Sequence, residues 1–142
     1  MKQMEDSLEI GNTIFRSRLF VGTGKYPNNK TMVEAIRASE TAMVTVAVRR
    51  IDLDRTKEEG ILFHLDPEEF FLLPNTAGCH NVKDALRYAN LGRAAGFSEW
   101  IKLEVIGDET TLLPDTKATI EAAEILVADG FKVMAYTNDD LI

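Results

Sequence analysis

The sequence has very few of the residues that form covalent cross-links or bind metals. Its 142 residues include one cysteine, Cys79, and two histidines, His64 and His80. A single thiol excludes an internal disulfide, which fits a reducing compartment. Two histidines and one cysteine do not make a convincing metal site. We therefore expect neither a disulfide nor a metal centre.

The sequence also lacks an excess of basic residues and any long apolar run. It has 16 Lys and Arg against 23 Asp and Glu, a net charge of −7, which argues against nucleic-acid binding. No stretch approaches the roughly 20 apolar residues of a membrane helix. The segment from Met1 to Asp6 lacks the apolar core of a signal peptide. We expect a soluble cytoplasmic protein that binds neither nucleic acid nor membrane.

Complete nucleotide-binding motifs are missing as well. Gly22-Thr23-Gly24-Lys25 has part of a phosphate-binding loop, but Leu19 and Tyr26 occupy positions where the Walker motif needs glycine and Ser or Thr. No Gly-x-Gly-x-x-Gly fingerprint is present. These glycines therefore favour a tight turn or a close backbone approach, and we expect no cofactor.

What the sequence does contain is a regular alternation of short apolar runs and amphipathic stretches. Five runs predict strands: Leu19 to Gly24, Ala42 to Val48, Phe70 to Leu73, Trp100 to Ile106, and Phe131 to Tyr136. Three stretches predict helices: Thr31 to Ser39, Asn81 to Leu91, and Asp115 to Ala128. Leu8 to Ile14 predicts a hairpin that turns at Gly11-Asn12. The pattern indicates an α/β fold with a parallel sheet covered by helices, in one domain over residues 1–142.

Several element boundaries follow from local chemistry. Asn81 and Asp115 are suited to cap helix starts, and Gly92 to end the first of these helices. Pro74 should end the third strand. In the last helix, Ile120, Ala123 and Val127 share one face.

Polar residues gather where the predicted strands end. They are Thr23 to Tyr26, Arg49-Arg50, Asn75-Thr76, and Tyr136 to Asp139. Sites in parallel α/β folds lie at the carboxyl ends of the strands. Polar residues also occur wherever a chain leaves its core, so the clustering alone leaves both interpretations open.

The run from Trp100 to Ile106 carries two charged residues inside an apolar strand. Because side chains alternate across a strand, Lys102 and Glu104 point to the same side. A buried lysine is costly to keep charged, and nearby cations such as Arg49 or Arg50 would add to that cost. Lys102 is therefore a candidate for a neutral amine that forms an imine, with Glu104 moving protons.

Two alternatives remain open from the residues alone. Lys102 and Glu104 would also fit a structural ion pair in a polar layer. Cys79 and His80, next to a predicted helix start, suggest a thiol catalyst, although a packed free cysteine is the more common outcome.

Six segments resemble the thiazole synthase family of thiamin biosynthesis, in the family's order and over nearly the whole chain. They are Ser17 to Tyr26, Val44 to Arg50, Leu73 to Gly78, Trp100 to Glu104, Leu112 to Asp115, and Tyr136 to Asp140.

The resemblance implies a parallel β/α (TIM-type) barrel and a defined reaction. Lys102 matches the family's imine-forming lysine, which acts on the ketone of 1-deoxy-D-xylulose 5-phosphate. Glu104 matches a family carboxylate suited to proton transfer. Sulfur would come from the thiocarboxylate of a small sulfur-carrier protein, and condensation with dehydroglycine would close the thiazole ring.

The predicted barrel is incomplete. Such barrels take about 250 residues and eight strands, whereas the pattern gives five core strands and an N-terminal hairpin. Unpaired strand edges and uncovered apolar surface promote association, so we expect a homo-oligomer. Two other functions stay open: a non-catalytic barrel piece that needs a partner, and a Schiff-base lyase of the aldolase type.

Overall fold

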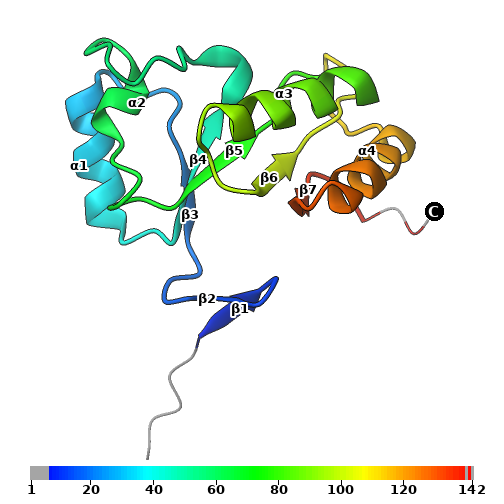
Figure 1. The fold of residues 1–142 in the computed structure, drawn as a ribbon, viewed down its shortest axis with the longest axis horizontal. Helices are drawn as coiled ribbons and strands as arrows, with labels where there is room; N and C mark the ends of the chain where they lie inside the picture. Colours follow the sequence, from blue (N-terminus) through cyan, green and yellow to red (C-terminus); the bar gives the residue numbers. More distant parts are fainter. Residues whose placement is uncertain (1–6, 140, 142) are drawn as a thin grey trace, which may run out of the picture.

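Five parallel strands form the sheet on which the rest of the molecule is built. The computed structural model describes residues 7–139 and 141, so the expectations for Met1 to Asp6 and for Asp140 lie outside it. The strands are β3 (Phe20–Gly22), β4 (Met43–Ala47), β5 (Leu72–Asn75), β6 (Trp100–Leu103) and β7 (Lys132–Ala135), and they lie side by side in sequence order (Figure 1). The predicted parallel α/β sheet is confirmed.

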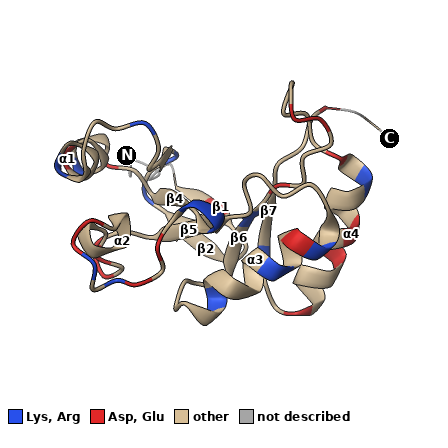
Figure 2. Cartoon of the chain, turned by 90° about the horizontal axis from the view of Figure 1, so that it is seen from above, with Lys and Arg blue, Asp and Glu red and all other residues tan. Residues whose placement is uncertain are grey.

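Helices connect the strands and cover one face of the sheet. They are α1 (Asn29–Ser39), the short α2 (Ile61–His64), α3 (Val82–Ala94) and α4 (Thr116–Ala128), with a 3₁₀ turn η1 (Val48–Arg50) after β4. In Figure 2 they follow one another around the outside of the strands. The predicted caps are confirmed: the Asn81 side chain accepts from the Asp84 N–H, and the Asp115 side chain accepts from the Ala118 N–H.

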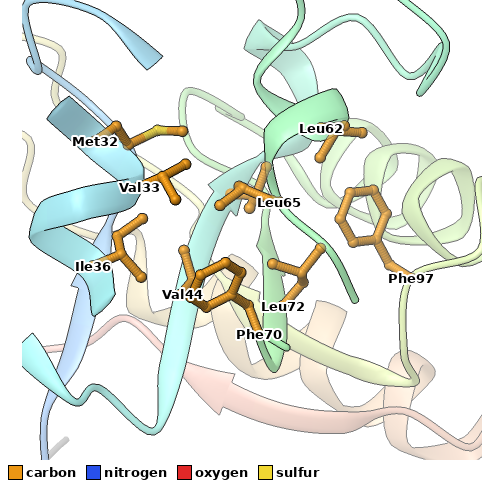
Figure 3. Packing of buried hydrophobic residues seen from close by; sticks show 10 residues of the cluster. Met32, Val33, Ile36, Val44, Leu62, Leu65, Phe70, Leu72 and Phe97 are labelled. Carbon is orange, nitrogen blue, oxygen red and sulfur yellow. The ribbon is translucent and has the colours of Figure 1, made fainter. Parts of the chain in front are cut away.

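The main core lies between the sheet and these helices. Around α1 and α2, a buried cluster joins helix residues such as Met32 and Ile36 to Val44 and Leu72 of the strands (Figure 3). Around α3 and α4, a second cluster joins Ala85 and Ala122 to strand residues such as Ile101. Alternation along the strands then turns Thr45, Asn75 and Lys102 toward the opposite, inner face.

The hairpin closes the inner face at the amino ends of the strands. It consists of β1 (Leu8–Ile10) and β2 (Thr13–Phe15), paired antiparallel as predicted. The Phe15 ring makes edge-to-face contacts with Phe20, Phe71 and Trp100 at centroid distances of 6.1, 5.7 and 5.8 Å. Because apolar rings fill this end, only the carboxyl end of the inner face remains open.

Two predicted boundaries are wrong for packing reasons. Pro74 does not end its strand, because it lies within β5 opposite Val46. Gly92 does not end α3, which continues to Ala94. Gly92 is buried, and a Cβ there would approach Val48 to 3.3 Å, so this glycine permits the helix to pack closely on the layer below.

The apolar face that the sequence pattern gives for α4 is not the face that the helix buries. The helix buries Thr119, Ala122 and Leu126, while Ile120 and Val127 are 51% and 59% exposed. Since α4 is apolar on more than one side, its periodicity does not decide which side faces the sheet.

None of the helices in residues 7–139 is long and apolar enough to cross a membrane.

Neighbouring residues of β2 provide a test of the aromatic closure. Phe15 is 6% exposed and Ile14 is 68% exposed. Phe15→Ala removes three ring contacts and should lower the free energy of unfolding by about 3–5 kcal/mol, as measured by urea denaturation. Ile14→Ala, the matched control, should change it by no more than about 0.5 kcal/mol. Equal effects of the two substitutions would show that the hairpin does not close the sheet as described.

Candidate active site

A hollow of about 430 Å³ lies at the carboxyl ends of β5, β6 and β7. Side chains from four segments converge on it, among them Arg49, Lys102, Glu104 and Tyr136. Of the polar residues predicted to gather at the strand ends, Arg49, Arg50 and Tyr136 line this hollow. Parallel strands direct their carboxyl ends to one edge, which explains how residues distant in sequence share this hollow.

Lys102 and Glu104 meet in the hollow. The Lys102 Nζ lies 3.0 Å from Glu104 Oε1 and 5.9 Å from the centre of the Tyr136 ring. The side chains of Lys102 and Glu104 are 37% and 13% exposed. The sequence prediction of one shared face is thus confirmed, but the prediction of a buried lysine is wrong, because the open end of the sheet gives its amine access to the hollow.

Thr76 holds the backbone that carries Glu104. The paired part of β6 ends at Leu103, three residues earlier than predicted. Beyond it, the buried Thr76 hydroxyl donates to the Glu104 carbonyl and accepts from the Glu104 N–H, both at 2.8 Å. One side chain therefore replaces the strand-to-strand ladder at the point where the carboxylate enters the site.

Arg49 is fixed beside the lysine by a glycine. Its guanidinium donates to the Gly78 carbonyl, and a Cβ on Gly78 would lie 3.0 Å from the same guanidinium nitrogen. Gly78 also has a φ of +81°, which glycine adopts without strain. The position therefore requires glycine for both conformation and space.

Sequence reasoning missed a second polar pair in the hollow. Because a carbonyl oxygen only accepts, His80 Nδ1–H donates to the Ile106 carbonyl at 3.2 Å. The other nitrogen, Nε2, lies 3.5 Å from Glu109 Oε1. Glu109 lies on the loop after β6, and nothing in its local pattern distinguishes it from an ordinary exposed carboxylate.

The same loop is tied to the end of β7. Tyr136 Oη donates to the Leu112 carbonyl at 3.1 Å, and Leu112 adopts a φ of +59°. Ile106 and Pro114 form a bridge at the base of the loop. These contacts hold Glu109 and Leu112 against the rim of the hollow.

Cys79 does not fit the alternative of a thiol catalyst. It is 1% exposed and packs in the cluster beneath α3 and α4. Burial raises the pKa of its thiol from 9.0 to about 11, which disfavours the nucleophilic thiolate. Cys79 is a packing residue, while its neighbour His80 lies in the hollow.

A second hollow, of about 340 Å³, adjoins the first. It lies over the carboxyl ends of β3, β4 and β5 and includes Gly22, Thr45 and Asn75. Arg50 and Ala77 line both hollows.

Among residues 7–139, no group of three or more potential metal ligands lies together.

The strand order, the covering helices and the site at the carboxyl ends define a segment of a parallel β/α-barrel protein. Comparison with known families is consistent with this class. Residues 9–142 match the model of the family described as thiazole biosynthesis protein ThiG, and the chain belongs to that family.

Individual relatives agree. The chain is 54% identical to the thiazole synthase of Thermodesulfovibrio yellowstonii over 139 residues and 54% identical to that of Solibacter usitatus over 140 residues. Each match covers 98% of this chain and 54% of the relative, so the chain spans about half the length of these curated relatives. A solved structure, the BexX/CysO complex of Amycolatopsis orientalis, superposes with a TM-score of 0.72 at 27% identity, covering 92% of this chain and 53% of that one.

The Thr76 hydroxyl provides a test of how the site is held. Thr76→Val keeps the volume but leaves the Glu104 N–H and carbonyl without their partner, so the free energy of unfolding should fall by about 1–3 kcal/mol. Thr76→Ser keeps the hydroxyl and should therefore avoid most of this loss. Urea denaturation of both variants measures the difference, and equal losses would contradict the bridging role.

Proposed function

We propose that the chain supplies the amino-terminal part of a thiazole synthase and carries its imine-forming lysine. The observation that carries this proposal is the meeting of Lys102 and Glu104 in a hollow at the carboxyl ends of the strands. Membership of the thiazole biosynthesis family supports it, as does 54% identity to proteins named thiazole synthase.

In the proposed reaction, the Lys102 amine adds to the ketone of 1-deoxy-D-xylulose 5-phosphate and the carbonyl oxygen leaves as water. Tautomerisation of this imine moves the carbonyl along the sugar. Sulfur then enters from the thiocarboxylate of a sulfur-carrier protein, and condensation with dehydroglycine completes the ring. The partly exposed position of Lys102 supports the first step, because a carbonyl substrate reaches the amine through the open hollow.

Glu104 is placed to move the protons that these steps require. Its carboxylate lies at hydrogen-bond distance from the lysine nitrogen, so a carbon next to the imine would also lie close to it. Its low exposure limits competition from bulk water. The Thr76 bridge fixes the backbone on which it is carried.

The sulfur-carrier partner is supported by a solved relative. The structure with the TM-score of 0.72 is a complex of BexX with CysO. We infer that a small carrier protein delivers its terminal thiocarboxylate to the hollow of this chain. Because the chain spans about half of its relatives, the remaining strands and most of the phosphate site of the proposed enzyme would be supplied by residues beyond those described.

Trapping the imine tests the lysine. The full-length protein, mixed with 1-deoxy-D-xylulose 5-phosphate and reduced with borohydride, should gain the mass of one sugar adduct, with the modified peptide containing Lys102. Lys102→Ala should reduce the adduct to background, because no other amine is paired with a carboxylate in the hollow among the described residues.

Two variants control this experiment. Lys117→Ala removes an exposed amine of α4 and should leave the adduct unchanged. Glu104→Gln should still form the adduct, but should slow deuterium exchange at the carbon next to the imine by about 100-fold. An adduct of normal yield on Lys102→Ala protein would refute the assignment of the lysine.

A second candidate function is an assembly piece that pairs with another barrel portion. It is favoured by the edges of the described sheet, where β3 and β7 each have a neighbour on one side only, and by the exposed Ile120 and Val127 of α4. Such edges and apolar surfaces promote association. Analytical ultracentrifugation of the 142-residue chain should therefore show dimers or larger species, and a stable, folded monomer would count against a need for a partner.

A further inference from the structure

Three Lys and Arg side chains line the hollow that contains Lys102, and they differ in how they are engaged. Lys102 contacts Glu104, and Arg49 donates to the Gly78 carbonyl. Arg50 forms no hydrogen bond or ion pair with any part of the chain that the structure describes. Its guanidinium is thus the one Lys or Arg head group of the hollow whose donors are all available.

The backbone separates the two arginines. Arg49 and Arg50 are consecutive residues at the end of η1, and only Arg49 extends to the loop after β5. Arg50 lines both hollows and therefore lies at the boundary between the lysine and the loop after β3. A ligand that enters from either side would meet this guanidinium.

The second hollow has the chemistry of a small polar subsite. Its lining includes the side chains of Thr45 and Asn75, together with Gly22 and Gly24 of the β3 end. The Thr23 hydroxyl donates to the Thr45 carbonyl, which fixes the loop over the floor. A Cβ on Gly22 would lie 3.3 Å from the Thr45 hydroxyl oxygen, so glycine keeps this floor open. No acidic residue lines this hollow within the described residues.

We propose that Arg50 binds an oxyanion of the ligand whose carbonyl or imine carbon reacts at Lys102. A guanidinium presents a planar fork of donors that matches the two oxygens of a carboxylate or phosphate. Arg50 has no partner in the described chain, and the described lining of the second hollow has no acidic residue. A positive charge in this position favours an anionic ligand over a neutral one. The two sources of such an oxyanion are a carboxylate, as in a small α-imino acid, and a phosphate ester.

The link to Lys102 rests on the proposed function, whereas the anion subsite does not. The binding experiment therefore uses Lys102→Met full-length protein, in which no imine forms at this position. Calorimetric titration measures the dissociation constants of two unreactive probes, oxamate for the carboxylate and inorganic phosphate for the phosphate ester. Arg50→Gln in this background should weaken the probe that binds here by about 10-fold or more, because a charge-assisted pair is lost.

Two further substitutions make the result specific. Arg50→Lys keeps the charge without the fork and should give an intermediate loss. Arg87→Gln removes one positive charge from the outside of α3 and should leave both constants unchanged. An effect on oxamate alone identifies a carboxylate site, and an effect on phosphate alone identifies a phosphate site. Unchanged constants in Arg50→Gln protein, or failure of both probes to bind, would overturn the inference.

Borohydride trapping with the neutral ketone 1-deoxy-D-xylulose separates this inference from the proposed function. This ketone has no oxyanion, so trapping on Lys102 should be the same with and without Arg50→Gln. If trapping on Lys102 persists and Arg50→Gln does not change the dissociation constants of the probes, the anion subsite is refuted and the imine-forming role of Lys102 is unaffected. If trapping is lost and probe binding still depends on Arg50, the imine-forming role of Lys102 is refuted and the anion subsite is retained.

Discussion

The geometry of the site depends on the hydroxyl of one buried threonine. Parallel strands present their carboxyl ends to a common edge, but β5 and β6 pair directly only where Asn75 meets Lys102. Beyond that pair, the two segments are joined by backbone hydrogen bonds from the Thr76 N–H to the Lys102 carbonyl at 3.2 Å and from the Ile106 N–H to the Cys79 carbonyl at 2.8 Å. The Thr76 hydroxyl donates to one Glu104 backbone group and accepts from the other, and a buried group of this kind is costly to leave unpaired. The carboxylate is held near the lysine for this reason.

The two ends of the inner face of the sheet have opposite properties. At the amino ends, Phe15 and Trp100 belong to a cluster of rings that excludes water. At the carboxyl ends, Thr45, Asn75 and Lys102 line open hollows. One end of the inner face is packed and the other is open, which is the arrangement expected in β/α barrels, whose sites lie at the carboxyl ends of the strands. A lysine two residues along β6 from a buried tryptophan is therefore both anchored and accessible.

The neighbouring residues Arg49 and Arg50 differ in their partners. Arg49 has a structural partner in the Gly78 carbonyl, and its position requires a glycine with positive φ. Arg50, the next residue, has no partner in the described chain and borders both hollows. Adjacent residues of one type thus have different surroundings, because only Arg49 reaches the Gly78 carbonyl. His80 and Glu109 add a second polar pair at the rim of the same hollow.

The sequence by itself determined the elements, their caps and the shared face of Lys102 and Glu104. These features depend on local periodicity and on side-chain hydrogen bonds three residues apart, as at Asn81 and Asp115. Only the tertiary structure decided the rest. Helix α3 continues past Gly92 because this glycine allows it to pack closely on Val48. The contact of α4 with the sheet buries Leu126 and leaves Val127 exposed. The approach of β5 to β6 made Thr76 a bridge, because contacts between residues 28 positions apart leave no local signal.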